Sequence, residues 1–243
     1  MNARFPFSLA LAGIALLLVG GAVGWTVRAG RSGGLDDTEF GSRVHAYIVD
    51  HPEVLVEAAE KLKAQGGRQQ LADVAAQVEK PFAGAVLGNP QGTVTLVEFT
   101  DFACTYCRAS LADVEAVISA NPDLRVVIRE LPIIAPTSEE AARWGLAAAE
   151  QGKYPAFHKA MFAAGRTDQA SVEAAARAAG LDLDRARRFA RDSRVSAEIE
   201  ANVGLARKLG IDGTPSWVAG EQLLTGAIGR QGLARAVAAA RGK

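Results

Sequence analysis

The chain has few cysteines, histidines and aromatic residues, and it has no excess of charge of either sign. Its 27 basic and 27 acidic residues cancel to a formal net charge of zero. Domains that bind nucleic acid carry a basic stripe interleaved with aromatic residues, so we expect no nucleic-acid partner. The basic stretch at 185–194 is interrupted by Ala, Phe and Asp, and its spacing indicates a solvent-exposed helix face.

The scarcity of cysteine and histidine also limits metal binding. A zinc ribbon needs two CxxC pairs, and the chain has one, formed by Cys104 and Cys107. The three histidines, His45, His51 and His158, do not lie at a metal-ligand spacing near this pair. We therefore expect no structural metal site, and any thiol chemistry must come from these two cysteines.

The N-terminus contains the one long apolar run. Residues 5–27 carry no charge and consist largely of Leu, Ala, Val and Gly. A helix crosses a bilayer with about 20 apolar residues, whereas the apolar core of a signal peptide has about 7 to 15. We expect residues 1–30 to be an uncleaved transmembrane anchor. A cleaved signal peptide is the alternative, because residues 22–24 fit a small-x-small cleavage site.

Residues 35–80 are predicted to form a helical stalk or oligomerisation segment. Apolar residues recur there at helical spacing in three stretches, and Gly66-Gly67 is expected to end the second. Stripes this narrow cannot bury a core of their own. They can pack on the following domain, act as a stalk or pair with other copies. The outer stripes comprise Phe40, Val44, Tyr47 and Ile48, and Leu71, Val74, Ala75 and Val78.

Residues 81–243 are predicted to form an α/β domain. A buried strand at 93–100, a helix and a second strand at 124–131 form a right-handed parallel unit. Helices at about 138–209 follow, one of them running from 182 to a stop at Gly210. A hairpin and a terminal helix close the chain. This order is that of a thioredoxin-like core with an inserted all-helical subdomain.

The two cysteines lie where the first strand meets its helix. A helix N-terminus supplies free N–H donors and a partial positive charge, which lower a cysteine pKa from about 8.5 to about 3.5–7.5. We therefore expect Cys104 to attack as a thiolate and the more buried Cys107 to resolve the mixed disulfide. The alternatives are structural zinc, a structural disulfide that closes a very small loop, and a Cu(I) thiolate site.

A later motif strengthens the redox interpretation. Thr214-Pro215 stands at the start of a strand, where a proline suits a cis peptide bond in a tight turn. In a thioredoxin core this loop faces the CxxC pair. It leaves a free backbone edge with which an extended client segment can pair.

These motifs resemble the DsbA family of thiol-disulfide oxidoreductases. The resemblance covers "LGNPQGTVTLVEFTDFACTYCR", "LPIIAPTSEEAARWGLAAAEQGKY" and the stretch from 179 to 229. It implies that Cys104 is the nucleophile, Cys107 the resolving cysteine and Pro215 the cis-proline, with Thr214 before it. It also implies that Glu98 is a buried acid that exchanges a proton with Cys107. The alternative is a strand glutamate satisfied by solvent.

The N-terminal segment and the residues between the cysteines carry a further resemblance. The stretch "VHAYIVDHPEVLVEAAEKL" is similar to ScsC-like and Com1-like members, which implies a possible homo-oligomer. Thr105 and Tyr106 differ from the Pro-His of strong oxidants and the Gly-Pro of thioredoxin. We expect both to contact the client. Trp217 stands where Phe or Ala is more usual and is expected to shape the substrate groove.

The predicted function is formation or isomerisation of disulfides in unfolded or misoxidised client proteins, without a cofactor. A membrane redox partner would reset the cysteine pair. Disulfide chemistry needs an oxidising compartment, so we expect the domain in the bacterial periplasm or extracytoplasmic space, anchored to the inner membrane. A dedicated reductase of one client, such as a cytochrome c apoprotein or a metalloprotein, and a Cu(I)-binding thiol protein remain the alternatives.

Overall fold

A computed structural model describes residues 37–242 of the chain. The chain divides into two units, one ending at residue 61 and the other beginning at residue 62. The predicted anchor at 1–30 lies outside the described residues. None of the helices within residues 37–242 combines the length and the hydrophobicity that a membrane span needs.

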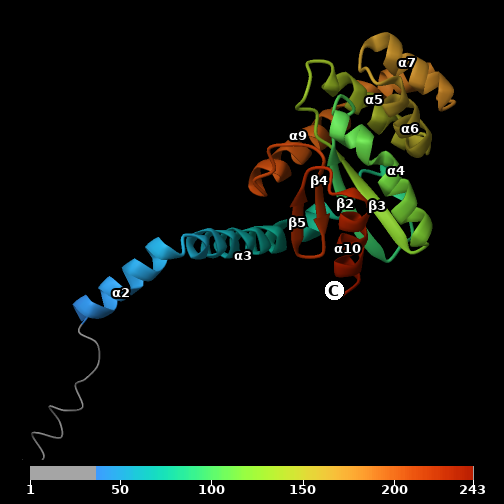
Figure 1. Ribbon diagram of the computed structural model, residues 1–243. Coiled ribbons are helices and arrows are strands. Elements are labelled where there is room, and N and C mark those ends of the chain that lie inside the picture. The colour runs from blue at the N-terminus through green and yellow to red at the C-terminus, as the bar shows by residue number, and fades with distance from the viewer. Residues whose placement is uncertain (1–36, 243) are drawn as a thin grey trace, which may run out of the picture. The chain divides into compact units, whose positions relative to one another are not determined.

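The described part begins with two helices, α2 (Asp37–Asp50) and α3 (Glu53–Val78) (Figure 1). Helix α3 continues through residues 66 and 67, so the prediction that Gly66-Gly67 ends a helix is wrong. A glycine inside a helix costs about 1 kcal/mol relative to alanine, but it keeps the N–H that a proline lacks. The neighbouring Ala, Leu, Lys, Glu and Gln residues are strong helix formers and offset this cost.

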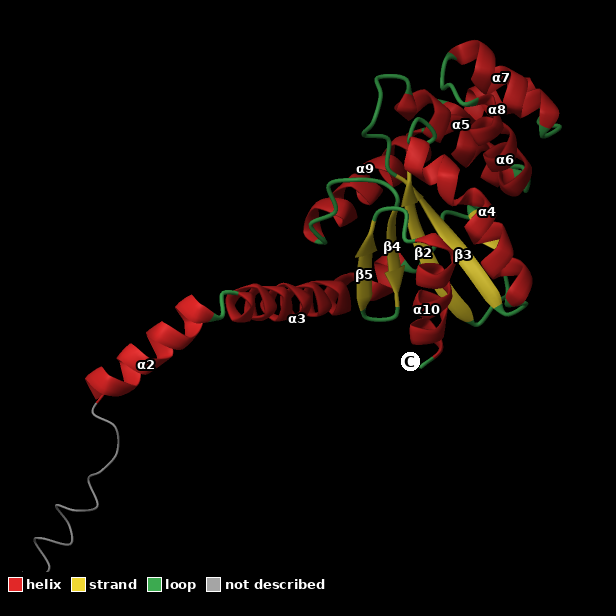
Figure 2. Ribbon diagram, in the orientation of Figure 1, coloured by secondary structure: helices red, strands yellow, loops and turns green. Residues whose placement is uncertain are grey.

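A five-stranded sheet in the order β1-β3-β2-β4-β5 forms the centre of the second unit (Figure 2). Strands β2 (Val94–Thr100) and β3 (Leu124–Glu130) are parallel and are connected by helix α4 (Thr105–Ala120), as predicted. Strands β4 (Ser216–Ala219) and β5 (Gln222–Thr225) form the predicted hairpin. The edge strand β1 (Val86–Gly88) lies where the sequence indicated only a loop.

Residues on the two faces of the sheet belong to two separate hydrophobic clusters. Leu96 and Ile128 pack with residues of α4 and of the terminal helix α10 (Gly229–Arg241). Val97 and Val127, one position further along each strand, pack on the other face. This alternation is expected for strands buried on both sides. It places Glu98 and Thr100 on the same face as Leu96, toward α4.

Five helices form the insertion between β3 and β4. The predicted single helix from 182 to 210 is divided in two, because Asp192 begins a new helix by accepting a hydrogen bond from the backbone N–H of Arg194. The five are α5 (Ser138–Glu150), α6 (Tyr154–Ala164), α7 (Gln169–Ala178), α8 (Leu183–Ala190) and α9 (Ser193–Lys208).

The C-terminal turns of α3 belong to the sheet-containing unit, although the sequence analysis assigned them to the stalk. Leu71, Val74 and Val78 are buried in the cluster that contains α9 and one face of the sheet. Of the three outcomes left open for the helical stripes, packing on the following domain is therefore the one that this stripe adopts.

Arg129 fixes the end of α3 on this face. Its guanidinium is buried and donates hydrogen bonds to the backbone carbonyls of Gln77, Val78 and Lys80. It also forms an ion pair with Glu198 on α9, with an N–O distance of 2.8 Å. A cation at a helix C-terminus satisfies carbonyls that lack helical partners.

Replacing Arg129 by alanine should lower the free energy of unfolding by about 3–5 kcal/mol, because the carbonyls and Glu198 would lose their buried partner. Urea unfolding measures the effect. Arg207→Ala, an exposed position on α9, is the matched control and should change stability by less than about 0.5 kcal/mol. Equal losses in both variants would contradict this role for Arg129.

Candidate functional site

The cysteine pair lies at the N-terminus of α4. Cys104 is the residue that caps the helix, and its Sγ accepts a hydrogen bond from the backbone N–H of Cys107 at 3.3 Å. Both cysteines are free thiols, and 5% of Cys104 and 1% of Cys107 is exposed. A helix N-terminus stabilises negative charge on a capping atom. The junction of strand and helix thus places Cys104 at the start of α4 and Cys107 in its first turn.

The predicted proline loop reaches the same sulfur. The Thr214-Pro215 peptide bond is cis, as predicted from the sequence. The thiol of Cys104 donates a hydrogen bond to the carbonyl oxygen of Thr214, with a distance of 3.1 Å. The carbonyl of Pro215 accepts from the backbone N–H of Gly226, which ties this loop to the end of the hairpin. The structure therefore brings together the two motifs that the sequence analysis singled out.

The two residues between the cysteines face solvent. Thr105 and Tyr106 occupy the first turn of α4, and 66% of Tyr106 is exposed. Both side chains are therefore accessible beside Cys104, and their contact with a client stays a prediction.

Trp217 does not lie in a surface groove, and the structure corrects this prediction. Its side chain is fully buried, and its indole N–H donates to the carbonyl oxygen of Gly226 at 3.0 Å. Strand β4 pairs Trp217 with Glu98 of β2, so the indole lies on the same face of the sheet as Glu98. Its aromatic ring fills the core below the proline loop and makes no client contact there.

Glu98 is buried on the face of the sheet that α4 covers. Only 3% of it is exposed, and its neighbours in register are Ile128 and Trp217. Burial raises the pKa of Glu98 from 4.5 to about 8, and the Thr100 hydroxyl partly offsets this rise. The alternative of a glutamate satisfied by solvent is therefore wrong.

The resolving cysteine is electrostatically coupled to this acid. Burial raises the pKa of Cys107, and the negative charge of Glu98 raises it further. A charge on either group therefore disfavours a charge on the other. Two groups that interact in this way titrate as a pair and not independently.

Two further buried acids were missed by the sequence analysis. The carboxylate of Asp101 accepts hydrogen bonds from the backbone N–H groups of Ala103, Ile133 and Ile134. Glu130, at the end of β3, accepts a hydrogen bond from the Tyr154 hydroxyl at 2.6 Å, and burial raises its pKa. The sequence did contain a signal for both acids. Asp101 directly follows β2 and Glu130 ends β3, and an acidic residue at the end of a buried strand is itself expected to be buried.

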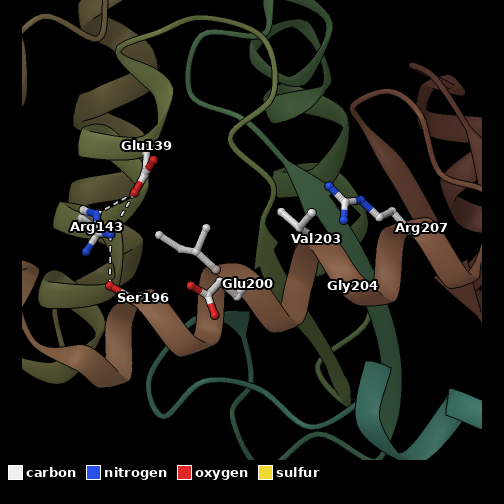
Figure 3. A pocket seen from close by; sticks show the side chains of 8 residues that line it. Glu139, Arg143, Ser196, Glu200, Val203, Gly204 and Arg207 are labelled. Atoms are coloured by element: carbon white, nitrogen blue, oxygen red, sulfur yellow. Dashed lines mark hydrogen bonds and ion pairs between the residues drawn. The ribbon is translucent and has the colours of Figure 1, made fainter.

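The two surface hollows of the described residues are not lined by either cysteine. One of about 410 Å³ is formed between α5 and α9, and its Arg143 side chain is held by Glu139 and Ser196 (Figure 3). The charge of Arg143 is thus already paired. Within residues 37–242, no group of three or more His, Cys, Asp or Glu side chains could hold a metal ion.

A model of the "DSBA-like thioredoxin domain" family matches residues 95–238, and a model of the "Copper resistance protein ScsC N-terminal domain" family matches residues 36–69. A thioredoxin-like oxidoreductase from Silicibacter pomeroyi is 43% identical, with a TM-score of 0.64, and the match covers 68% of this chain and 95% of that one. The catalytic domain of ScsC from Proteus mirabilis is 27% identical, with a TM-score of 0.64, and the match covers 72% and 99%.

A curated relative is a Na⁺/H⁺ antiporter, NhaA 1, from Salinispora arenicola. It is 30% identical over 158 residues, which are 64% of this chain but 24% of the antiporter. The chain thus spans about a quarter of that relative's length. The model for residues 95–238 matches more than half of this chain, and the fold, the CxxC pair and the cis-proline agree with it. The chain therefore belongs to the DSBA-like thioredoxin domain family.

Proposed function

We propose that this protein exchanges disulfides with client proteins through a Cys104–Cys107 dithiol centre. One observation carries the proposal. The sulfur of Cys104 lies at a helix N-terminus and contacts the carbonyl oxygen of Thr214 beside the cis-proline. A client cysteine that pairs with this loop would stand next to the nucleophile.

The exchange has two steps. In the first, the Cys104 thiolate attacks a client disulfide, a new S–S bond forms between Cys104 and the client, and the other client sulfur leaves as a thiolate. In the second, Cys107 loses its proton and attacks Cys104 Sγ. The Cys104–Cys107 disulfide forms, and the first client sulfur leaves as a thiolate. The client has gained two electrons, and the reverse order of steps oxidises it.

Glu98 accepts the proton that the Cys107 thiol loses in the second step. A buried thiol cannot release its proton to bulk water, because 1% of Cys107 is exposed. Glu98 is the coupled acid, and its pKa of about 8 lies near neutral pH. A carboxylate with this pKa accepts a proton readily and returns it readily, which general acid–base transfer requires.

The clients are unfolded or misoxidised proteins, and we favour oxidation or isomerisation of their disulfides. The N-terminal helices support an oligomer, which would place several cysteine pairs around one client. Phe40, Tyr47 and Leu55 are each more than half exposed and recur at intervals of seven and eight residues. Exposed apolar stripes of this kind are typical of helices that associate.

The proposed location is the bacterial periplasm or extracytoplasmic space, where disulfides persist. The apolar run at 5–27 would anchor the chain in the inner membrane, and a membrane partner would reset the cysteine pair. The absence of a third cysteine from the sequence supports this location, since no other thiol could be trapped.

A second candidate function is Cu(I) binding. It is supported by the match of residues 36–69 to the N-terminal domain family of the copper resistance protein ScsC. Two thiolates are soft ligands suited to Cu(I). Anaerobic titration with Cu(I) tests this candidate. Stoichiometric binding that is lost in both Cys→Ser variants would favour it, and the absence of binding would exclude it.

Replacing Cys107 by serine should cause mixed disulfides between Cys104 and the client to accumulate, because the second step is removed. Non-reducing mass spectrometry during refolding of a scrambled client measures these adducts. Cys104→Ser is the control and should form none. If Cys104→Ser refolds the client as fast as the natural chain does, the proposed function is wrong.

Replacing Glu98 by glutamine should weaken the dependence of the free energy of unfolding on pH for the dithiol form. The folded pKa of about 8 exceeds the ordinary 4.5, so between these values the folded chain holds a proton that the unfolded chain releases. The free energy of unfolding therefore falls as pH rises, by about 1.4 kcal/mol per unit for one proton. Urea unfolding at pH 5 and pH 8 measures the difference, and an equal fall in the variant would contradict this assignment.

Replacing both Phe40 and Tyr47 by serine should reduce the mass of the assembly, because these side chains supply apolar area to the proposed helix contact. Light scattering of the full chain in detergent at several concentrations measures the mass. Val49→Ser is the matched control, since 62% of Val49 is exposed and it lies half a turn away from Phe40. A natural chain that is monomeric throughout would refute the oligomer.

A further inference from the structure

The proline loop, which comprises residues 213–215, is held by the side chains of the two residues that follow it. Ser216 and Trp217 begin β4, and both are buried. The Ser216 hydroxyl donates a hydrogen bond to the carbonyl oxygen of Gly213 at 2.8 Å. Successive side chains of a strand point to opposite faces of the sheet. Ser216 therefore holds the start of the loop from one face, and Trp217 lies on the other.

Trp217 reaches the loop through Gly226, the residue that follows β5. Its indole N–H donates to the carbonyl oxygen of Gly226 at 3.0 Å, and the backbone N–H of Gly226 donates to the carbonyl oxygen of Pro215 at 2.8 Å. The φ angle of Gly226 is 82°, which lies in the left-handed region that favours glycine. A single glycine thus connects the indole to the proline loop by two hydrogen bonds.

The indole N–H does more than fill the core. A phenylalanine would supply an apolar ring without a donor, whereas a buried indole N–H is costly unless it finds an acceptor. Trp144, the other tryptophan within residues 37–242, is also buried, and its N–H donates to Glu140 of its own helix at 2.8 Å. Of these two tryptophans, Trp217 is the one whose donor is directed at the site.

The connection continues to the nucleophile. Pro215 follows Thr214, whose carbonyl oxygen accepts a hydrogen bond from the Cys104 thiol at 3.1 Å. A loop that is fixed on both sides has fewer conformations to lose, and a preordered surface binds with a smaller entropy cost. An extended polypeptide that pairs with this loop would gain from that order. A small disulfide that touches only Cys104 would not.

We propose that Trp217 is a positioning residue that orders the proline loop through Gly226, and that this order gives the dithiol centre a preference for extended polypeptide disulfides over small-molecule disulfides. This inference rests on the proposed function and specifies its substrate class. Trp217 acts from the core through the two hydrogen bonds of Gly226, and it touches no client.

The test compares two disulfides that share a leaving thiol. One is an unstructured peptide whose single cysteine is held in a mixed disulfide with 2-mercaptoethanol. The other is 2-hydroxyethyl disulfide, which has no peptide backbone to pair with the loop. In both reactions the Cys104–Cys107 dithiol loses two electrons and two protons, and the substrate disulfide is released as two thiols. Mass spectrometry after alkylation of stopped reactions gives each rate.

The sharpest variant replaces Trp217 by 3-benzothienylalanine, an isostere of tryptophan in which sulfur takes the place of the indole N–H. Oxidation by the peptide should slow about tenfold at low peptide concentration, because one ordering hydrogen bond is lost. The loss should appear as a higher KM with an unchanged maximal rate. Oxidation by 2-hydroxyethyl disulfide should stay within about twofold of the natural chain, since the cysteine pair is intact.

Hydrogen exchange supplies an independent measurement. The amide of Gly226 should exchange about tenfold faster in the isostere variant, because the carbonyl on the same residue is no longer held. Trp217→Phe also removes the donor and should show both effects, so that either variant suffices if the other does not fold. The same isostere at Trp144 is the matched control and should change neither quantity.

The outcomes are distinguishable. Equal slowing with both disulfides would overturn the inference, because the defect would then lie at the cysteine pair and not in the loop. An unchanged rate with the peptide, or unchanged exchange at the Gly226 amide, in a folded variant would overturn the role of Trp217. A natural chain that neither disulfide oxidises would instead refute the proposed function on which this inference rests.

Discussion

The contact between Cys104 Sγ and the Thr214 carbonyl is the interaction on which the site depends. It joins segments that are 110 residues apart in the chain. The helical insertion occupies most of that interval, so the site forms only when β4 returns to the centre of the sheet beside β2. Long-range strand pairing thus does more than stabilise the fold, because it presents a backbone carbonyl to the sulfur at the helix N-terminus.

Charged side chains are buried on both faces of the sheet that carries this contact. On one face, Glu98 lies between apolar neighbours and has a raised pKa near the resolving thiol. Nearby, Asp101 holds the loops that surround Cys104. On the other face, Arg129 fixes the end of α3 through backbone carbonyls. Buried charged groups are costly unless they are paired or hydrogen-bonded, so their presence here indicates specific local roles.

Local sequence signals predicted the fold and the cysteine site well. The buried strand before Cys104, the helix after it and the proline at 215 each carry a pattern that neighbouring residues determine. The failures have physical reasons. Gly66 and Gly67 are tolerated inside α3, and β1 is too short for periodicity to reveal it. The burial of Trp217 and the contacts of Asp101 depend on register and on distant loops, which local patterns do not contain.

The proposed exchange requires that Cys104 and Cys107 form one redox couple. The direct measurement is to equilibrate the chain with mixtures of reduced and oxidised glutathione, block free thiols with an alkylating agent and weigh the products. As the share of oxidised glutathione rises, chains with two blocked thiols should be replaced by chains with none through a single midpoint, because the intramolecular disulfide forms as one unit. Thiols that remain blockable in excess oxidised glutathione, or that stop as separate glutathione adducts, would contradict it.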